Sequence, residues 1–350
     1  NPCQMVSGAG GSSLLSGGKI SDYPAGSSMS AVLGGEEQTK RSLENSLSIL
    51  STFLPLISPQ YDASEIEAAR LFYQSKGFEF RDYPAYLYRQ PDLVTAYAKI
   101  VETIESSGST VQFGAKVTEI LKNKKGMFEL TIQLEEGQVQ IEAEKVLLGV
   151  GRLGSELLIN LNEKYALGGE PNRCDIGIRL EFPASLWPEI DRAHNDLKLH
   201  FGDARTFCVC KEGFIAPYLL GDIFLLEGSS EPDTSTGFTN LALTMRVEPT
   251  EHLNSVSLLQ EVRRRLFEHS KGNPRPVRQR LDDYFAQRAT SDDRRSLPTS
   301  ISYWIWGDAN DCFPDEISEP LRASVRQFCS GLLPIDRWNE ISVFAPEMDY

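Results

Sequence analysis

Two parts of the sequence carry residues whose types and spacing suit chemistry. The first is a glycine- and serine-rich run over residues 7–35, SGAGGSSLLSGGKISDYPAGSSMSAVLGG, which includes Lys19. Glycine leaves backbone N–H groups open to close approach, so such a turn suits a pyrophosphate or a flat ring. The candidate contacts are Gly8, Gly10, Gly11, Ser12, Ser13, Gly17 and Gly18, together with Lys19. A flexible linker is the competing interpretation, and the apolar Leu14-Leu15 pair argues against it.

The second part is Cys208-Val209-Cys210. It falls in a predicted strand, so both thiols should face the same side, with their Cα atoms about 6.5–7 Å apart. That separation lies at the upper edge for a disulfide. The pair is either two buried small side chains or a thiol group beside a bound redox group. A serine nucleophile is not indicated, because no G-x-S-x-G occurs, and the scattered histidines and lack of a CxxC pair argue against a zinc site.

A third glycine segment, Gly149-Val150-Gly151-Arg152-Leu153-Gly154, formally matches G-x-G-x-x-G. It lies at the end of a predicted buried strand, Ala143–Arg152, and no acidic residue follows at the spacing that holds a ribose. The motif therefore does not predict a dinucleotide site by itself. The Lys19 segment is not a P-loop either, because Ile20 stands where a hydroxyl is required.

Composition narrows the class of protein. The 350 residues carry 49 acidic against 35 basic side chains, a net charge of −14, and 41% are hydrophobic. These values exclude collagen-like and wholly disordered chains and disfavour nucleic-acid binding. No apolar run is long enough to cross a bilayer. Six cysteines are too few for a disulfide scaffold, which favours a reducing compartment such as the cytoplasm or, after loss of a targeting segment, an organelle interior.

Hydrophobic periodicity places the elements that must position these groups. It predicts helices over 42–54, 64–73 with Ser64 and Glu67 as a capping box, and from 91 to about 107. Strands follow over 111–117, 128–132, 139–141 and 143–152. Beyond residue 166 the sequence becomes rich in strands, and a helix runs from 258 to about 270. Residues 263–295 form a basic island, interpreted as a solvated helix face or a phosphate site.

In this order the segments resemble the FAD-dependent dehydrogenase-like proteins, flavoproteins of the glutathione-reductase-like class with two dinucleotide-binding domains. The similarity covers nearly the whole chain. The segments that carry it are Asn1–Cys3, Ser7–Ile20, Val146–Gly154, Cys174–Glu181, Thr206–Gly213, Gly228–Leu243 and Pro276–Tyr284. We expect the chain to be a central fragment, because the family's strand–GxGxxG–helix start would precede Asn1 and its closing flavin-binding segment would follow Tyr350.

The resemblance implies FAD as cofactor and an α/β fold: an FAD/NAD(P)-binding domain of the glutathione-reductase type with an inserted, mainly antiparallel β second domain. The expected boundaries are 1–165 and 301–350 for the FAD-binding part and 166–300 for the substrate domain. The residues expected to hold FAD are Ser7, Gly8, Gly10, Gly11, Ser12, Ser13, Ser16, Gly18, Lys19, Val117, Gly149, Val150, Gly151 and Arg152. Lys19, Cys208 and Cys210 are the catalytic candidates, and Arg179, Phe207 and Asn240 are expected on the substrate side.

The function expected from the resemblance is that of an FAD-dependent oxidoreductase, dehydrogenase-like, acting on a small molecule, with NAD(P)H open as electron donor and no nucleic-acid, membrane or metal partner. A second interpretation is a flavin-fold protein without catalysis that binds a ligand or partner. Its support is that Ser13, Gly17 and Lys211-Glu212 replace the family's Gly, Asp and Pro-Gly. A third is an anion-binding module built on the Arg263–Arg295 island.

Overall fold

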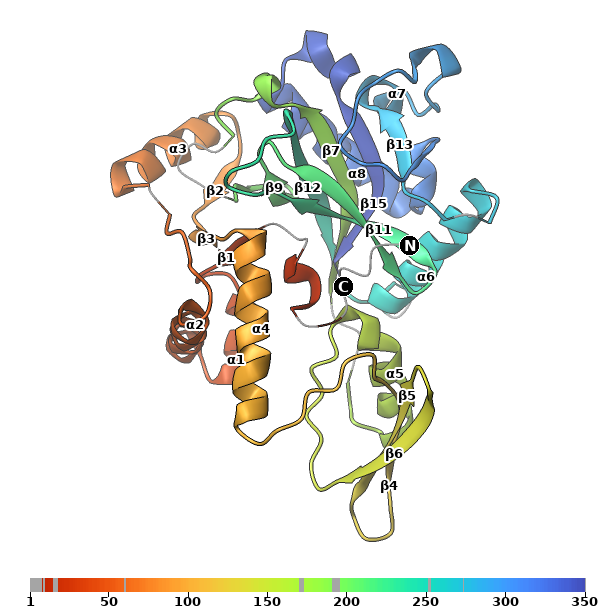
Figure 1. Cartoon of the computed structure of the whole chain (residues 1–350). Coiled ribbons are helices and arrows are strands. Elements are labelled where there is room, and N and C mark those ends of the chain that lie inside the picture. The colour runs from red at the N-terminus through yellow and green to blue at the C-terminus, as the bar shows by residue number, and fades with distance from the viewer. Residues whose placement is uncertain are drawn as a thin grey trace.

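The computed structural model describes residues 8, 10–14, 18–59, 61–169, 173–190, 196–250, 253–272 and 274–349. Its centre is an eight-stranded sheet in the order β14-β13-β15-β7-β12-β9-β8-β2 (Figure 1). Neighbouring strands are antiparallel except for the parallel pair β13 and β14. The strands are β2 Glu79–Arg81, β7 Cys174–Pro183, β8 Lys198–Phe201, β9 Ala204–Cys210, β12 Phe238–Val247, β13 Val277–Arg280, β14 Ile305–Trp306 and β15 Ser342–Asp349.

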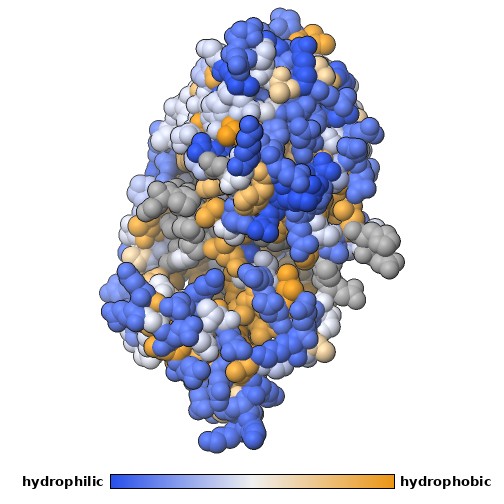
Figure 2. Space-filling model, turned by 90° about the vertical axis from the view of Figure 1, so that its right-hand side faces the viewer, coloured by the Kyte–Doolittle hydropathy of each residue, from blue (hydrophilic) through white to orange (hydrophobic). Residues whose placement is uncertain are grey.

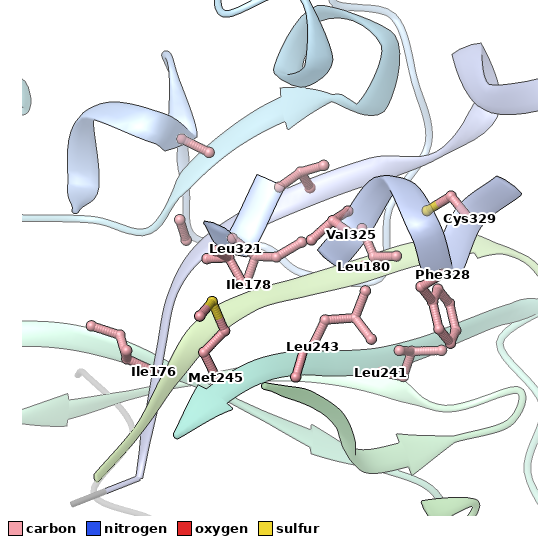
Figure 3. Close-up of a cluster of buried hydrophobic side chains, with 14 of the residues drawn as sticks. Ile176, Ile178, Leu180, Leu241, Leu243, Met245, Leu321, Val325, Phe328 and Cys329 are labelled. Carbon is pink, nitrogen blue, oxygen red and sulfur yellow. The ribbon is translucent and has the colours of Figure 1, made fainter. Parts of the chain in front are cut away.

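One face of this sheet is apolar because side chains alternate along its strands. In β7 the residues Ile176, Ile178 and Leu180 share that face, and Leu241, Leu243 and Met245 extend it on β12 (Figure 3). Helix α8 (Asp315–Leu332) covers it with Leu321, Val325 and Phe328. Helices α3 (Ala63–Ser75) and α6 (Ser255–His269) contribute buried side chains to the same core, and the short α7 (Leu281–Phe285) follows β13.

The polar residues of β7, including Arg179, alternate with the apolar ones. A hairpin of β10 (Phe214–Leu220) and β11 (Ile223–Ser229) packs against the sheet through β9, β12 and β15. It brings Ile215 and Leu226 to Phe344, the cross-strand neighbour of Arg179. The hairpin therefore encloses polar side chains that a single sheet would leave in water.

Two smaller parts lie beside the large sheet in Figure 1. A three-stranded antiparallel sheet of β4 (Lys116–Lys122), β5 (Phe128–Leu134) and β6 (Gly137–Ala143) packs with α5 (Ser155–Tyr165) around Ile120, Leu130 and Leu161. The other part holds the helices α1 Ser30–Leu33, α2 Glu36–Ser51 and α4 Gln90–Ser106 and the two-stranded pair β1 (Lys19–Ser21) with β3 (Ala85–Leu87).

The structure confirms a mixed α/β fold with a large mixed sheet and antiparallel strands through the middle of the sequence. The segment predicted to return to the FAD-binding part contributes β15, which pairs with β7. The chain therefore shows no break in packing near residue 300. Whether the predicted boundaries separate functional domains stays a prediction.

Two predicted strands are wrong. Residues 144–150 have no regular secondary structure, and Leu147 is 98% exposed. A buried strand needs hydrogen-bonded neighbours at its edges, and no described strand pairs with this stretch, so Leu147 and Leu148 remain exposed while Val146 packs against the Ile120 cluster. The strand predicted over 111–117 is also wrong for most of its length, because β4 begins only at Lys116.

The capping box of α3 lies two residues earlier than predicted. Asp62 is the N-cap, and its carboxylate accepts hydrogen bonds from the backbone N–H groups of Ser64 and Glu65. The Glu65 side chain in turn accepts from the backbone N–H of Asp62. An ionised carboxylate satisfies these donors and favours the positive end of the helix dipole, so Asp62 takes the place predicted for Ser64.

The apolar face of the sheet should tolerate truncation poorly. We expect Leu243→Ala, at a fully buried position, to lower the free energy of unfolding by about 2–5 kcal/mol, because the cavity collapses only in part. Leu71→Ala on α3 is the matched control, because Leu71 is 59% exposed. Urea denaturation of the two variants measures the difference, and equal losses would contradict the assignment of this face as the core.

Candidate functional site

Lys19 begins β1 and is buried against the large sheet. Its side chain is 5% exposed, and its Nζ lies 3.5 Å from Oδ1 of Asp196, whose side chain is 8% exposed. The same ammonium donates a hydrogen bond to the carbonyl oxygen of Val209 and lies 3.8 Å from Sγ of Cys210. Asp196 also accepts from the backbone N–H of Val209 at 3.0 Å and from Nζ of Lys198 at 2.7 Å. The glycine-rich segment is thus fastened to the end of β9.

Cys208 and Cys210 lie at a β-bulge. The pairing of β12 with β9 shifts register between Asn240 and Ala242, and Cys208 has a φ of 44°, in the left-handed region that side chains rarely adopt. The two Sγ atoms are 3.8 Å apart and both residues are free thiols, as are the other cysteines that the structure describes. The two thiols were predicted to lie on one side of a regular strand; in the structure they are in contact, and a bulge brings them together.

Arg179 of β7 is fully buried and links the cysteine bulge to residues of β11, β12 and β15. Its guanidinium makes two hydrogen bonds to the carboxylate of Glu347, at 3.0 and 2.7 Å. It also donates to the carbonyl oxygen of Cys208 at 3.2 Å and to Oδ1 of Asn240 at 2.8 Å. Glu227 of β11 lies 3.9 Å from the same guanidinium. Three of the predicted residues, Arg179, Cys208 and Asn240, therefore form one contact network.

Burial and charge set the protonation states in this network. The hydrogen bond from Cys208 lowers the pKa of Cys210 to about 7, and the charges of Lys19 and Arg179 help to outweigh the opposing effect of burial. The pKa of Cys208 is raised, because its proton is held in that hydrogen bond and the thiol is buried. Burial would lower the pKa of Lys19, but the negative charge of Asp196 reverses the effect and keeps the ammonium charged.

Glu227 is a buried acid that holds its proton near neutral pH. Its pKa is raised to about 8, chiefly by burial and then by the neighbouring Cys208, although Arg179 and Arg152 act in the opposite direction. The site therefore holds a protonated carboxyl, a thiol with a raised pKa and a thiol with a lowered pKa, so its three acids differ in how readily they release a proton. Such a set can hold and pass protons near neutral pH, which is typical of redox and acid–base sites.

Arg152 joins the glycine turn at 149–152 to this region. It donates to the hydroxyl of Tyr218 at 2.7 Å and to Oδ1 of Asp349 at 2.6 Å. Among the residues that the structure describes, and apart from the chain neighbours, no atom lies within 4 Å of the place where a Cβ would stand on Gly149 or Gly151. The backbone of this turn is therefore open to a bulky group, while its one cationic side chain is occupied by protein partners.

The first glycine turn is anchored by two tyrosines. Tyr88 donates its hydroxyl proton to the carbonyl oxygen of Ser13 at 2.7 Å, and Oγ of Ser13 is 3.0 Å from the hydroxyl of Tyr97. Gly10 fits against the Tyr97 ring so closely that a Cβ would stand 2.4 Å from it. Gly8 and Gly11 have positive φ and open space above their Cα atoms. This turn too leaves backbone free for close approach.

These observations test whether the residues suit FAD, which the resemblance implies. Two glycine turns leave room beside their backbone, as a flat cofactor requires. The buried Nδ2 of Asn240, part of the Arg179 network, has no hydrogen-bond partner in the described part of the chain. Open turns and an unused donor are compatible with a cofactor, so the residues fit this group.

The remaining predicted positions lie outside the network or outside the described residues. Val117 is in β4 and packs with the cluster of Ile120, Leu130 and Leu161. The Phe207 ring lies under the ammonium of Lys198, 5.0 Å from its centroid. Val150 lies within the second glycine turn, between Gly149 and Gly151. Gly18, next to Lys19, packs closely, because a Cβ there would stand 2.3 Å from the carbonyl oxygen of Ser230. Ser7 and Ser16 lie outside the described residues, as does the side chain of Ser12.

Sequence reasoning missed the acids of the network, Asp196, Glu227 and Glu347. A signal was present for two of them, because Glu227 is the one charged residue of β11 and Glu347 directly follows the apolar run 343–346 of β15. A buried charge needs a buried partner, and Arg179, the one cation of the buried strand β7, was the matching residue. Asp196 precedes its strand in a polar stretch and gave no comparable signal.

Nowhere among the described residues, this network included, do three or more His, Cys, Asp or Glu side chains form a group that could bind a metal ion. The helices that the structure describes are all too short or too polar to cross a membrane.

Comparison with known proteins gives three results. Residues 178–336 match the family described as FAD-dependent protein, C-terminal domain-like, a segment that includes Arg179, both cysteines and Glu227. An uncharacterized protein of Clostridium beijerinckii is 24% identical over 259 residues, which span 68% of this chain and 48% of the relative. The chain therefore covers about half the length of the curated relative that it matches.

Among solved structures, the anhydrotetracycline hydroxylase OxyS from Streptomyces rimosus matches with a TM-score of 0.25 and 12% identity, over 59% of this chain and 40% of that one. A likeness this low carries no argument about the fold. The family match, by contrast, covers the part of the large sheet that holds the cysteines and Arg179. It points to FAD as the cofactor.

Proposed function

We propose that this chain is part of an FAD-dependent oxidoreductase acting on a small molecule, with the Cys208–Cys210 pair as its thiol redox group. The observation that carries the proposal is the arrangement of the two thiols, 3.8 Å apart in a β-bulge with the Lys19 ammonium 3.8 Å from Cys210. The match to a family of FAD-dependent proteins over residues 178–336 supports it. NAD(P)H stays open as the electron donor, and the cytoplasm remains the expected compartment.

Lys19 acts on the cysteine pair through charge. The thiolate, not the thiol, is the reactive form of cysteine, and a neighbouring cation stabilises it. Because Asp196 and the carbonyl oxygen of Val209 hold the ammonium in place, its charge remains fixed beside Cys210. Lys19 is therefore a positioning and electrostatic residue in this proposal, and Cys210 is the thiol that ionises first.

Glu227 is the proton donor and acceptor beside Cys208 in this proposal. Burial and the neighbouring Cys208 raise the pKa of its carboxyl to about 8, which leaves it largely protonated at neutral pH. A proton at the Glu227 carboxyl can then move to or from Sγ of Cys208 without solvent entering the buried network. Arg179 holds the backbone of Cys208 through its carbonyl oxygen and so fixes the bulge.

The residues that would hold FAD are those of the two open glycine turns, Gly8 to Ser13 and Gly149 to Gly151. FAD, when bound, supplies the electron acceptor or donor for the reaction. The protein's part is to keep the cysteine pair buried and to exclude water from it, which strengthens every charge interaction there.

The first prediction concerns electron transfer through the cysteine pair. In the complete protein with its flavin, we expect Cys208→Ser and Cys210→Ser each to slow flavin reduction by dithiothreitol by roughly 100-fold, the scale on which removal of a positioned reacting group acts. Lys19→Met should slow it less, because both thiols remain. Absorbance of the flavin gives both the rate and the cofactor content.

Two controls accompany these variants. Cys329→Ser changes a buried thiol on α8 that lies in the apolar core, and it should leave the rate unchanged. Light-driven reduction of the same samples bypasses the thiols and should proceed equally in all of them. Unchanged dithiothreitol rates in Lys19→Met, Cys208→Ser and Cys210→Ser together would remove the redox role and favour the ligand-binding alternative.

The second prediction concerns the charge of Lys19. Loss of the ammonium in Lys19→Met should raise the pKa of Cys210 above its value of about 7, so that less thiolate is present at neutral pH. Ultraviolet thiolate absorbance followed over pH, with Cys210→Ser subtracted, measures this change. Lys40→Met removes an exposed lysine of α2 and is the control. If the Lys19→Met and control curves coincide, the proposed electrostatic role is wrong.

A further inference from the structure

A cleft of about 450 Å³ opens at one end of the large sheet. Its charged lining consists of Arg81, Arg173, Arg205 and Arg246 against Asp175 and Asp349, with His200 among them. Cavities of this size hold small-molecule ligands in other proteins. Four arginines around one cleft are unusual in a chain whose net charge is −14, so the cleft has an electrostatic character opposite to that of the protein as a whole.

The ion pairs within the cleft leave positive charge in excess. Arg205 and Arg246 share one carboxylate, that of Asp175. Asp349, the other acid of the lining, is already bound by Arg152 from outside the cleft. Arg81 pairs with Glu79, at a site where both side chains are about half exposed. Even with Arg173, which has an interaction of its own, left out of the count, the four arginines Arg81, Arg152, Arg205 and Arg246 face the three acids Asp175, Asp349 and Glu79. The buried Nε of Arg205 has no hydrogen-bond partner in the described structure, and neither has Oδ1 of Asp175.

His200 lies among the same charged groups. Its pKa is lowered to about 4, chiefly by burial and then by the charges of Arg81, Arg205 and Arg246, while Glu79 acts in the opposite direction. His200 is therefore neutral at physiological pH and leaves the excess charge to the arginines. A bound anion would reverse this effect and raise the pKa of His200.

We infer that this cleft binds the phosphate ester of a second small molecule, either the substrate or a phosphorylated electron donor, separately from FAD. The planar guanidinium matches phosphate oxygens in pairs of hydrogen bonds, which makes arginine clusters suited to phosphate recognition. Ser27 and Ser28 add hydroxyl groups to the same lining. None of the open glycines of the two turns lines the cleft, which is why we assign it a ligand of its own. The inference goes beyond the proposed redox function and does not depend on the cysteines.

Equilibrium binding to the complete, flavin-containing protein tests the inference, with inorganic phosphate, ADP, NADH and NADPH as probes. We expect phosphate and at least one of the nucleotides to bind, with affinity that falls as salt rises. The double variant Arg81→Gln with Arg246→Gln should weaken this binding roughly tenfold or more, since each charged hydrogen bond lost has about that effect. Arg263→Gln with Arg264→Gln on α6 is the matched control, because it removes the same charge away from the cleft.

The probes also separate the two sources of the phosphate. Tighter binding of NADPH than of NADH would identify the phosphate monoester of an electron donor, whereas binding of phosphate and ADP without that preference would indicate a phosphorylated substrate. Lys19→Met and Cys210→Ser should not alter any of these affinities. Failure of the redox proposal would therefore leave this inference intact, and the reverse also holds.

A second readout needs no change in the cleft arginines. Phosphate titration followed by the His200 ring signals in proton NMR, assigned with His200→Gln, should raise the pKa of His200 from about 4. No binding of any probe, an equal loss in the α6 control, or displacement of phosphate by added FAD would each overturn the inference. So would an unchanged pKa of His200 at a phosphate concentration that saturates the protein.

Discussion

The structure depends on neutralising one charge, the guanidinium of Arg179 in the middle of the large sheet. An arginine cannot lose its proton in a protein, so burial at this point requires acceptors from several strands at once. Glu347 comes from β15, Asn240 from β12, the Cys208 carbonyl from β9 and Glu227 from β11. Removing one partner of a buried charge pair typically costs about 3–5 kcal/mol, so the register of these strands is strongly constrained by this side chain.

The Lys19–Asp196 pair constrains the fold in a related way, at the boundary between the N-terminal part and the sheet. Its ammonium lies 3.8 Å from Sγ of Cys210. The hydrogen bond between the two thiols is the main reason that the pKa of Cys210 is lowered and that of Cys208 raised. The charges of Lys19 and Arg179 favour the thiolate of both residues, so the two buried cations stabilise the ionised pair as well as the strands around it.

Much of the large sheet could be predicted because its signal is local. The sequence beyond residue 166 indicated a strand-rich part, and the structure places β7 and β12 from it at the centre of the sheet. The segment over 144–150 has an equally apolar sequence but no neighbouring strand, and a strand cannot form from its own residues alone. Local pattern therefore indicates the capacity to form a strand, while pairing decides whether one exists.

Some residues of the site could be predicted from the sequence, and others could not. Lys19, Arg179 and the two cysteines stood out by type and by their place in the motifs, and the structure brings them into one network. Their acidic partners come from distant strands, and the bulge at Cys208 depends on a register shift against β12. Contacts between residues far apart in the sequence depend on the fold, and no local sequence pattern predicts them.

The arginines also fall into two groups: those whose charge is balanced by a carboxylate of their own, and those that share one. Along α6 and the segment after it, Arg263, Arg264 and Arg294 each pair with nearby carboxylates, which accounts for these members of the basic island without a ligand. Arginines paired in this way at the surface contribute little to stability and create no net field. At the cleft, by contrast, two arginines share one carboxylate. Excess positive charge of this kind has an energetic cost that a bound anion would remove. The cleft, rather than the basic island, is therefore the place where this acidic chain favours binding of an anion.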